Sequence, residues 1–444
     1  MVLNKNKVKN IISYSIVLLP LLGQYGFMTK SLTLADIVLI PLLILIFLIN
    51  GKNKKVSIID KRIFIFFVWY IFSAIMMSLI ISELNIFSSI MSTIRCFIYS
   101  LAILCFSSDF IDIDKTLSLY TKVVLFLSCI IFVQVIIYKI TGNIKPWVIN
   151  SKYFPAVFVN DDYFSGGYLV QLGGSTFRAS SLFSEPALFA QYASPCLILN
   201  IFKDGKKNYW FLIMVTMATL LTKSANGMVY VIVAWIFTIF YLLYLQFKKK
   251  NRYIKSKYLI IIFVILIIFP FIYSNVYNYL VKGDNSLFSR LLEINDTRGE
   301  SSGSMRVMRG WHVYSGLKLH EKIFGIGNGN IEKYLDCHSG IVPTFTQAYN
   351  GYMSGLSGIF VNSGLIGGIL FFVWWITNFI NDNKMSKALL LFLLVYLIAS
   401  NSLFTLNFLL VLVLVITNNQ IEEKLKKEKR LINENINNYI AWYR

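Results

Sequence analysis

The sequence predicts an all-α polytopic integral membrane protein with about 12 transmembrane helices and a large external loop that contains short helices. Of the 444 residues, 56% are hydrophobic and only 14% are charged, whereas a soluble domain carries about 25% charged residues. Several uncharged apolar runs are long enough to cross about 30 Å of hydrocarbon. Short basic segments separate many of these runs, which is typical of multispanning membrane proteins.

The apolar runs give the order of the predicted helices. Window hydropathy places the spans near residues 11–28, 32–49, 63–82, 86–107, 118–139, 186–202, 209–222, 227–246, 258–276, 354–378, 387–400 and 404–418. The first apolar run is not followed by a small-residue cleavage site, and a second apolar run begins soon after it. We therefore expect the first helix to remain uncleaved. The units are 1–140 (helices 1–5), 141–185 (an external loop), 186–276 (helices 6–9), 277–353 (the large external loop), 354–418 (helices 10–12) and 419–444 (a basic tail).

Basic segments predict the orientation of the chain. If the helices alternate, "GKNKKVSIIDKR", "KDGKK", "KKKNRYIKSK" and "EEKLKKEKR" all fall on the side of Lys5, Lys7 and Lys9. The positive-inside rule makes this side cytoplasmic, with both termini there; the acidic segment 107–115 is an exception, and acidic residues weigh little in the rule. The net charge of +20 therefore indicates topology and contact with anionic membrane lipids, and it requires no nucleic acid.

The large external loop contains a patterned segment. The stretch "SGSMRVMRGWHVYSGLKLH" predicts a helix over 304–320 with Ser304 as the N-cap. Arg306 and Arg309 then share one face of this helix. The glycine-rich "FGIGNGN" (324–330) is expected to end the helix, because glycine permits a turn with positive φ. It resembles a phosphate-cradling turn only superficially, since no strand precedes it and no lysine with Ser/Thr follows.

A cation and a carboxylate stand before an apolar run in "FRASSLFSEPALFAQY". If this segment is helical, Arg178 and Glu185 lie about two turns apart and point the same way. Pro186 suits the first turn of the following helix, which places Glu185 at the water interface. Two interpretations stay open: interfacial charges that anchor a helix end, or a cation for an anionic substrate with a carboxylate that orients it or accepts a proton.

Arginines of the large loop form a second candidate group. Arg290, Arg306 and Arg309, with Arg298 between them, are suited to phosphate because a guanidinium binds it in a bidentate manner and stays protonated. The alternative is that they are solvated charges balanced by the acidic residues of the same loop.

Other polar residues also admit two interpretations. In "TKSANG" (222–227), Lys223 lies in a hairpin turn and is also positioned to face an anionic headgroup. In "HSGIVPTFTQAYNGY" (338–352), His338 is a group that titrates near neutral pH or a structural histidine. Arg95 is costly in lipid, so it should face the bundle or a wet cavity, where it holds helices together or contacts a headgroup. The five cysteines form no metal-binding or disulfide pattern.

Taken together, these segments resemble the O-antigen and capsular polysaccharide polymerase family (the Wzy type), within the group that also includes O-antigen ligases. "RASSLFSEPALFA" resembles the family's Arg…Phe…Glu-Pro element, and "LTKSANG" a short serine-containing element. "SMRVMRGW…FGIGNGN" resembles the loop element of Ser, Arg, Trp and Gly-x-Gly, and "YNGYMSGLSGIFVNSGLIGG" the element that leads into the next helix. Many relatives have His-Asn where this chain has Tyr349-Asn350, and a proline where it has "EKIF".

The resemblance implies a glycosyltransferase of the external face of the bacterial cytoplasmic membrane. Such enzymes join undecaprenyl-diphosphate-linked oligosaccharide repeat units: an acceptor hydroxyl attacks the donor's anomeric carbon and diphosphate leaves, with neither cofactor nor metal expected. A flippase and a chain-length regulator of the same pathway are the implied partners. The implied roles are diphosphate binding for Arg178 and Arg306, assisted by Arg290 or Arg309; orientation or proton acceptance for Glu185; and substrate binding for Lys223, His338, Tyr349 and Asn350.

Three rival functions remain. An O-antigen ligase would transfer finished glycan to another acceptor. A lipid-oligosaccharide flippase or other transporter would place charges near the membrane midplane and often show two related halves, whereas here the charges lie in external loops. A scaffold of an envelope assembly would need none of the external arginines.

Overall fold

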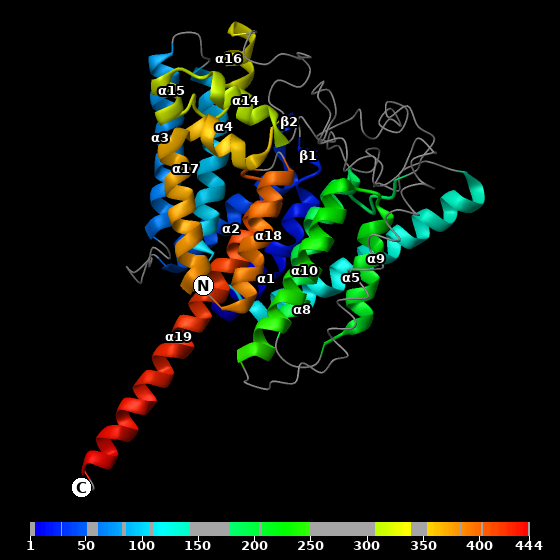
Figure 1. The fold of residues 1–444 in the computed structure, drawn as a ribbon, viewed down its shortest axis with the longest axis vertical. Coiled ribbons are helices and arrows are strands. Elements are labelled where there is room, and N and C mark those ends of the chain that lie inside the picture. The colour runs from blue at the N-terminus through cyan, green and yellow to red at the C-terminus, as the bar shows by residue number, and fades with distance from the viewer. Residues whose placement is uncertain are drawn as a thin grey trace.

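The computed structural model describes residues 5–27, 29–50, 61–81, 86–106, 110–142, 178–203, 207–248, 307–338, 353–381, 383–400 and 403–442. These residues are almost entirely helical (Figure 1). The helices are α1 (Lys5–Leu22), α2 (Leu34–Asn50), α3 (Lys61–Ile80), α4 (Ile86–Cys105), α5 (Ile113–Thr141), α8 (Pro186–Phe202), α9 (Tyr209–Leu221), α10 (Ala225–Lys248), α14 (Arg309–Gly316), α15 (Leu319–Phe324), α16 (Ile331–Cys337), α17 (Gly355–Asn381), α18 (Lys384–Ala399) and α19 (Leu406–Trp442).

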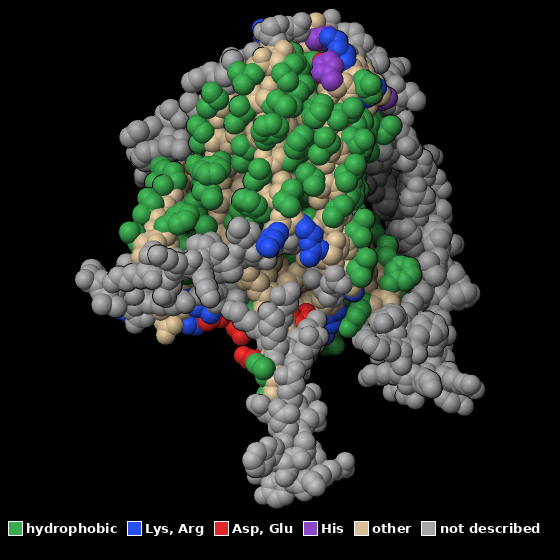
Figure 2. Space-filling view, turned by 90° about the vertical axis from the view of Figure 1, so that its left-hand side faces the viewer, with side chains coloured by type: hydrophobic (Ala, Val, Ile, Leu, Met, Phe, Trp, Pro, Cys, Tyr) green, Lys and Arg blue, Asp and Glu red, His purple; other side chains and the backbone are tan. Residues whose placement is uncertain are grey.

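The apolar helices indicate that the chain is a membrane protein. Among the described residues, three helices are long and apolar enough to cross a membrane: Lys61–Ile80, Ile113–Thr141 and Gly355–Ile380. Most of the other long helices contain shorter apolar stretches, and the predicted span at 258–276 lies outside the described residues. Figure 2 shows a belt of hydrophobic side chains across one face, with Lys and Arg at its lower margin and His with Lys or Arg at its upper end. This is the surface expected of a protein surrounded by lipid.

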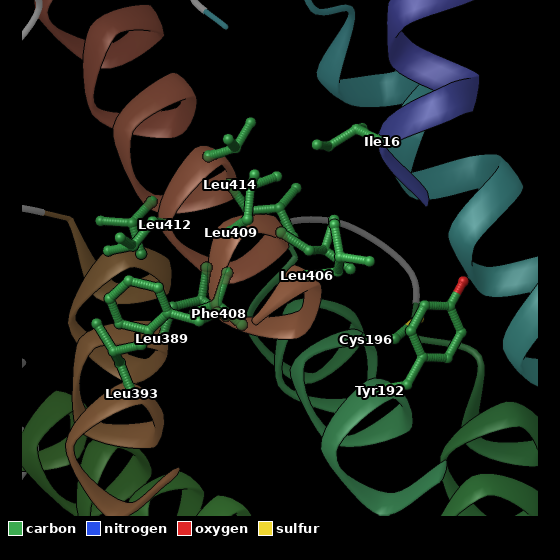
Figure 3. Close-up of a cluster of buried hydrophobic side chains, with 14 of the residues drawn as sticks. Ile16, Tyr192, Cys196, Leu389, Leu393, Leu406, Phe408, Leu409, Leu412 and Leu414 are labelled. Atoms are coloured by element: carbon green, nitrogen blue, oxygen red, sulfur yellow. The ribbon is translucent and has the colours of Figure 1, made fainter. Parts of the chain in front are cut away.

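Two helices form the centre of the bundle. Every residue of α19 from 406 to 418 is buried, as is nearly every residue of α8. A helix that is apolar on all sides must be surrounded by other helices, and α19 contacts α1, α4, α5, α8 and α18. Phe408 and Leu412 of α19 lie near Leu389 and Leu393 of α18 in this core (Figure 3).

Beyond the core, α19 continues without a break. The predicted span at 404–418 and the predicted basic tail belong to one helix that runs to Trp442. Its C-terminal part leaves the bundle at the end opposite to α14, α15 and α16 (Figure 1). The basic tail is therefore remote from α14, α15 and α16.

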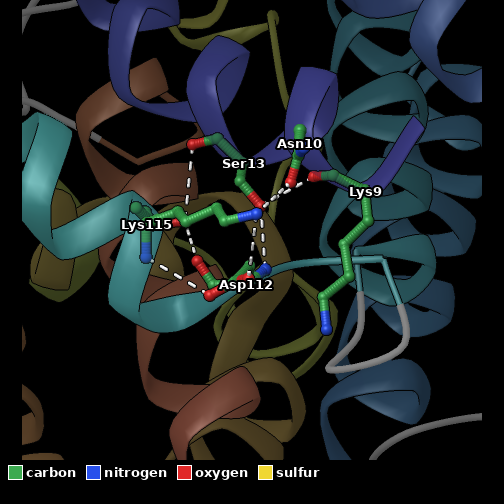
Figure 4. A network of polar contacts seen from close by, with 6 residues as sticks. Lys9, Asn10, Ser13, Asp112 and Lys115 are labelled. Carbon is green, nitrogen blue, oxygen red and sulfur yellow. Dashed lines mark hydrogen bonds and ion pairs between the residues drawn. The ribbon is translucent and has the colours of Figure 1, made fainter. Parts of the chain in front are cut away.

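The start of α5 is fixed to α1 by polar contacts (Figure 4). Asp112 is the N-cap of α5, and its side chain accepts the backbone N–H of Lys115. The Asp112 backbone N–H donates to Ser13 Oγ at 2.8 Å, and Lys115 Nζ donates to Asn10 Oδ1 at 2.8 Å. The acidic segment that is an exception to the charge rule thus supplies a helix cap, which favours an acidic residue for local reasons.

A short hairpin follows α1 where the sequence predicts more helix. The span expected at 11–28 ends at Leu22, and β1 (Gly26–Phe27) pairs antiparallel with β2 (Thr29–Thr33), with Gly26 opposite Thr33 and Phe27 opposite Thr29. The next helix begins here because Thr33 and Asp36 form a capping box: the Asp36 side chain accepts the Thr33 N–H at 2.9 Å and Thr33 Oγ1 accepts the Asp36 N–H at 3.2 Å.

Helix α17 is kinked at Gly364, which has φ 68° and ψ −171°. The kink releases carbonyl groups from the helical ladder, and other segments bind them. Val361 O and Asn362 O accept the backbone N–H groups of Ile326 and Gly327 at 2.9 and 3.0 Å, and Ser363 O accepts Trp69 Nε1–H at 2.9 Å. Buried carbonyl groups need such partners, so the glycine-rich segment at Ile326 and Gly327 and the kink stabilise each other.

Candidate functional site

The segment that carries Arg178 and Glu185 is an ordered turn, and the helical conformation considered for it is wrong. Ser181 has φ 58°, which no helix residue adopts. Gln134 of α5 holds this residue from both sides: its Oε1 accepts the Ser181 N–H at 2.9 Å and its Nε2 donates to Ser181 O at 3.0 Å. A fixed turn replaces the two helical turns, so the side chains of Arg178 and Glu185 have no common helix face.

Glu185 lies where the sequence places it, at the N-terminus of α8. It is the N-cap in extended conformation with Pro186 in the first turn, so the prediction for Pro186 is confirmed. The Glu185 side chain is half-buried and does not cap the helix, while the preceding Ser184 N–H donates to Gln24 Oε1 after α1. A carboxylate here is favoured by the helix dipole and remains available for chemistry.

Lys223 lies in a turn beside the start of α8. The predicted hairpin turn in "TKSANG" is confirmed, because α9 ends at Leu221, α10 begins at Ala225 and Lys223 has φ 51°. A Cβ added to Gly227 would lie 3.0 Å from Cβ of Ala190, one turn into α8. The Lys223 turn and the Glu185 cap therefore occupy the same end of α8.

A series of contacts connects this end of α8 to α14. The first residue of α19, Leu406, packs against Gly23, next to Gln24. The N-terminus of α17 meets the end of α18, since Gly355 N–H donates to Ser400 O at 2.7 Å. On the other side of α17, Gly310 of α14 packs so closely on Ser357 that a methyl group would overlap it. Among the described candidates, Glu185, Lys223 and Arg309 thus lie toward one end of the bundle.

Arg309 is the first residue of α14 and is buried, with 5% of its surface exposed. Burial lowers the pKa of its guanidinium to about 10, because desolvation disfavours the charged form. The side chain still carries its charge at neutral pH. A guanidinium presents its N–H donors in a planar fork, which is the chemistry that suits a phosphate group.

The predicted helix over 304–320 is two helices in the part that the structure describes. α14 ends at Gly316, and α15 begins after Lys318, whose φ is −65° and ψ 161°. Glu321 Oε2 accepts the Lys318 N–H at 2.7 Å and the Tyr334 hydroxyl at 2.7 Å, so a buried carboxylate starts a new helix and ties it to α16. The break also lets Leu317 enter a small core with Val313 and Tyr334.

The glycine-rich segment ends a helix, but this helix is α15 and not the expected one over 304–320, and the segment then packs against the bundle. Gly325, with φ 87°, is the C-cap of α15. Asn328 Nδ2 donates to Ser92 Oγ of α4 at 2.6 Å, and Asn330 Nδ2 donates to Ser78 Oγ of α3 at 2.9 Å. Its polar groups therefore hold the segment between α15 and α16 on α3 and α4.

His338 is held by α16. Its ring stacks on Tyr334 with centroids 4.4 Å apart, and its Nδ1 lies 3.0 Å from Tyr334 O. A neutral ring in this position donates through Nδ1–H, which leaves the lone pair on Nε2. The geometry fits a structural histidine and also a positioned base.

The other predicted site residues, Arg290, Arg306, Tyr349 and Asn350, lie outside the described residues. Their relation to Arg178, Glu185 and Arg309 stays a prediction. Within the described ranges, no three His, Cys, Asp or Glu side chains are grouped as metal ligands.

Sequence reasoning missed the residues that position this end of the bundle. Gln134 and Gln24 are distant from the 178–185 turn in the sequence. No sequence pattern around either glutamine indicates that it binds this turn. The capping box of Thr33 and Asp36 follows a readable Thr-x-x-Asp spacing, but the predicted span already begins at residue 32.

Comparisons with known proteins assign no family to the chain. No protein-family model matches the sequence, and no curated protein matches it.

Proposed function

We propose that the chain is a polysaccharide polymerase that joins undecaprenyl-diphosphate-linked repeat units on the external face of the bacterial cytoplasmic membrane. The observation that supports this most is the fixed turn 178–185, which carries a cation and a carboxylate just before the N-terminus of the buried helix α8. A substrate with a polyprenyl tail in the bilayer and a diphosphate above it has the matching distribution of apolar and anionic groups.

In this proposal, the guanidinium groups stabilise the departing diphosphate. Arg178 and Arg306 bind it, and Arg309 or Arg290 assists, because fixed cations stabilise charge that develops in the transition state. Glu185 orients a cation or accepts the proton of the attacking hydroxyl. The proposed membrane arrangement has about 12 spans, with the external helices outside and both termini in the cytoplasm.

Glycan length in cells tests the proposal. Cells that carry Arg178→Ala, Glu185→Ala or Arg306→Ala at normal protein levels should accumulate single repeat units and lack long polymer. Long polymer at wild-type abundance in all three variants would contradict the proposal and would fit a scaffold.

The accumulated product separates a polymerase from its nearest rival. Loss of a ligase leaves lipid-linked polymer that is not attached to its acceptor, whereas loss of a polymerase leaves single units. Purified protein that lengthens lipid-linked units without an ion gradient would exclude transport as its sole activity.

A further inference from the structure

A polar cluster joins α2 and α4 next to the hairpin that follows α1. Asp36, the third residue of α2, is buried and accepts four donors. The four donors are Thr33 N–H at 2.9 Å, Thr33 Oγ1–H at 2.8 Å, Tyr99 O–H at 2.9 Å and Arg95 Nη2 at 3.3 Å. Arg95 and Tyr99 are four residues apart and lie on one face of α4. The cluster therefore connects α2 and α4, which agrees with the expectation that Arg95 holds helices together.

The arginine is the least enclosed member of this cluster. Its side chain is 42% exposed, whereas that of Asp36 is 6% exposed. Three neutral donors already bind the Asp36 carboxylate at shorter distances than the arginine does. A guanidinium whose only task was to neutralise Asp36 would be expected inside with it, because an exposed intramembrane cation is costly.

The surface next to Arg95 is apolar. Ile90, Ile94 and Phe97 of α4 form an exposed stripe, and Arg95 lies at its edge, about 100° around the helix from Ile94 at 3.6 residues per turn. The start of α2, where Asp36 lies, follows directly after β2, and this hairpin occupies the same end of the molecule as α14 (Figure 1). Ser92, three residues before Arg95, is the first residue of the apolar part of α4, and its Oγ accepts Asn328 Nδ2–H at 2.6 Å. Arg95 therefore lies about one helical turn from the end of this apolar part, where we place the membrane boundary.

We propose that Arg95, held by Asp36, is a binding site for the phosphate group of a membrane lipid at this boundary. A guanidinium presents N–H donors in a planar fork that matches two phosphate oxygens. Lipid phosphates are the anions available where a hydrocarbon-facing surface ends. This inference does not depend on the proposed polymerase activity. Bulk anionic phospholipid and the polyprenyl diphosphate carrier share the chemistry.

Thermal unfolding of the purified, delipidated full chain tests the site. Phosphatidylglycerol added to phosphatidylcholine nanodiscs should raise the Tm of the wild type, and Arg95→Gln should weaken the apparent affinity for it about tenfold, the effect of about one charge-assisted hydrogen bond. Tyr99→Phe is the matched control, because it removes another Asp36 donor and leaves the arginine in place; it should keep the lipid response.

A second variant guards against loss of the fold. Arg95→Lys keeps the charge beside Asp36 and loses the fork, so it should fold and bind phosphatidylglycerol more weakly than the wild type. Unchanged lipid stabilisation in Arg95→Gln and Arg95→Lys, or an equal loss in Tyr99→Phe, would overturn the proposal. The same Arg95-dependent stabilisation by inorganic pyrophosphate alone would also overturn it, because the ligand would then not be a lipid.

Competition identifies the lipid. Undecaprenyl diphosphate that displaces phosphatidylglycerol at much lower concentration identifies the carrier as the ligand. Displacement at equal concentration identifies the bulk anionic lipid. Either result supports the site.

Discussion

The side chains of Glu185 and Arg309 differ in how the fold holds them. Glu185 is half-buried on a fixed turn, whereas Arg309 is buried at the start of α14. Each arrangement gives a different expectation for stability when the charge is removed.

Glu185→Gln should lower the rate of glycan elongation about 100-fold or more, the usual effect of losing a proton acceptor. Stability should change little, because the Glu185 side chain does not cap α8. Elongation by purified variants and their Tm values provide the measurement. Glu332→Gln, which changes an exposed carboxylate of α16, is the control, and an equal loss of rate there would refute a specific role for Glu185.

Arg309→Met should weaken binding of a diphosphate lipid and remove the part of the pH dependence of stability that comes from the buried guanidinium. The methionine side chain has a similar length and no ionisable group. The folded pKa of about 10 lies below the ordinary 12.5, so the unfolded chain holds its proton in this window and wild-type stability should rise with pH through it. Denaturation curves at several pH values should show this rise in the wild type and not in Arg309→Met; the same slope in both would contradict burial of the charged group.

At the scale of elements, the glycine kink of α17 is the feature on which the external helices depend. A methyl group at Gly364 would overlap the carbonyl of Ile323, in addition to the strain of a positive φ. Gly364→Ala should therefore cost about 2–5 kcal/mol of unfolding free energy. Gly142→Ala is the control with a similar φ of 65° and nothing within 4 Å, and it should cost only about 1 kcal/mol. Equal costs would show that the contact with α15 is unimportant.

Local chemistry decided which elements could be predicted. Pro186, the turn at Lys223 and the cap at Gly325 each need only neighbouring residues, so the sequence contains the full cause. The kink does not follow from "NSGLIGG", because a partner segment about 40 residues away, between Ile323 and Gly327, selects which glycine adopts positive φ. The break after Gly316 likewise depends on Tyr334 binding Glu321, and the turn at Ser181 depends on Gln134 of another helix.

At the scale of the whole molecule, the external helices and the end of α19 should lie on opposite sides of the membrane. Cys337 is exposed at the end of α16, and Glu428 is exposed on the distal part of α19. In intact spheroplasts of a Cys129→Ser background, a membrane-impermeant maleimide should label Cys337. In a second variant that combines Glu428→Cys with Cys337→Ser, the maleimide should label position 428 only after the spheroplasts are permeabilised. Labelling of both positions in intact spheroplasts would contradict the proposed topology.

Elongation by the purified chain in liposomes tests the central proposal most directly. Supplied only with undecaprenyl-diphosphate-linked repeat units, the wild type should produce a ladder of longer lipid-linked glycans and release undecaprenyl diphosphate. The Arg178→Ala variant should bind less substrate and leave single units. Two results would contradict the proposal that these arginines bind the diphosphate. One is that folded wild-type protein leaves only single units, and the other is that Arg178→Ala produces a ladder as long as that of the wild type.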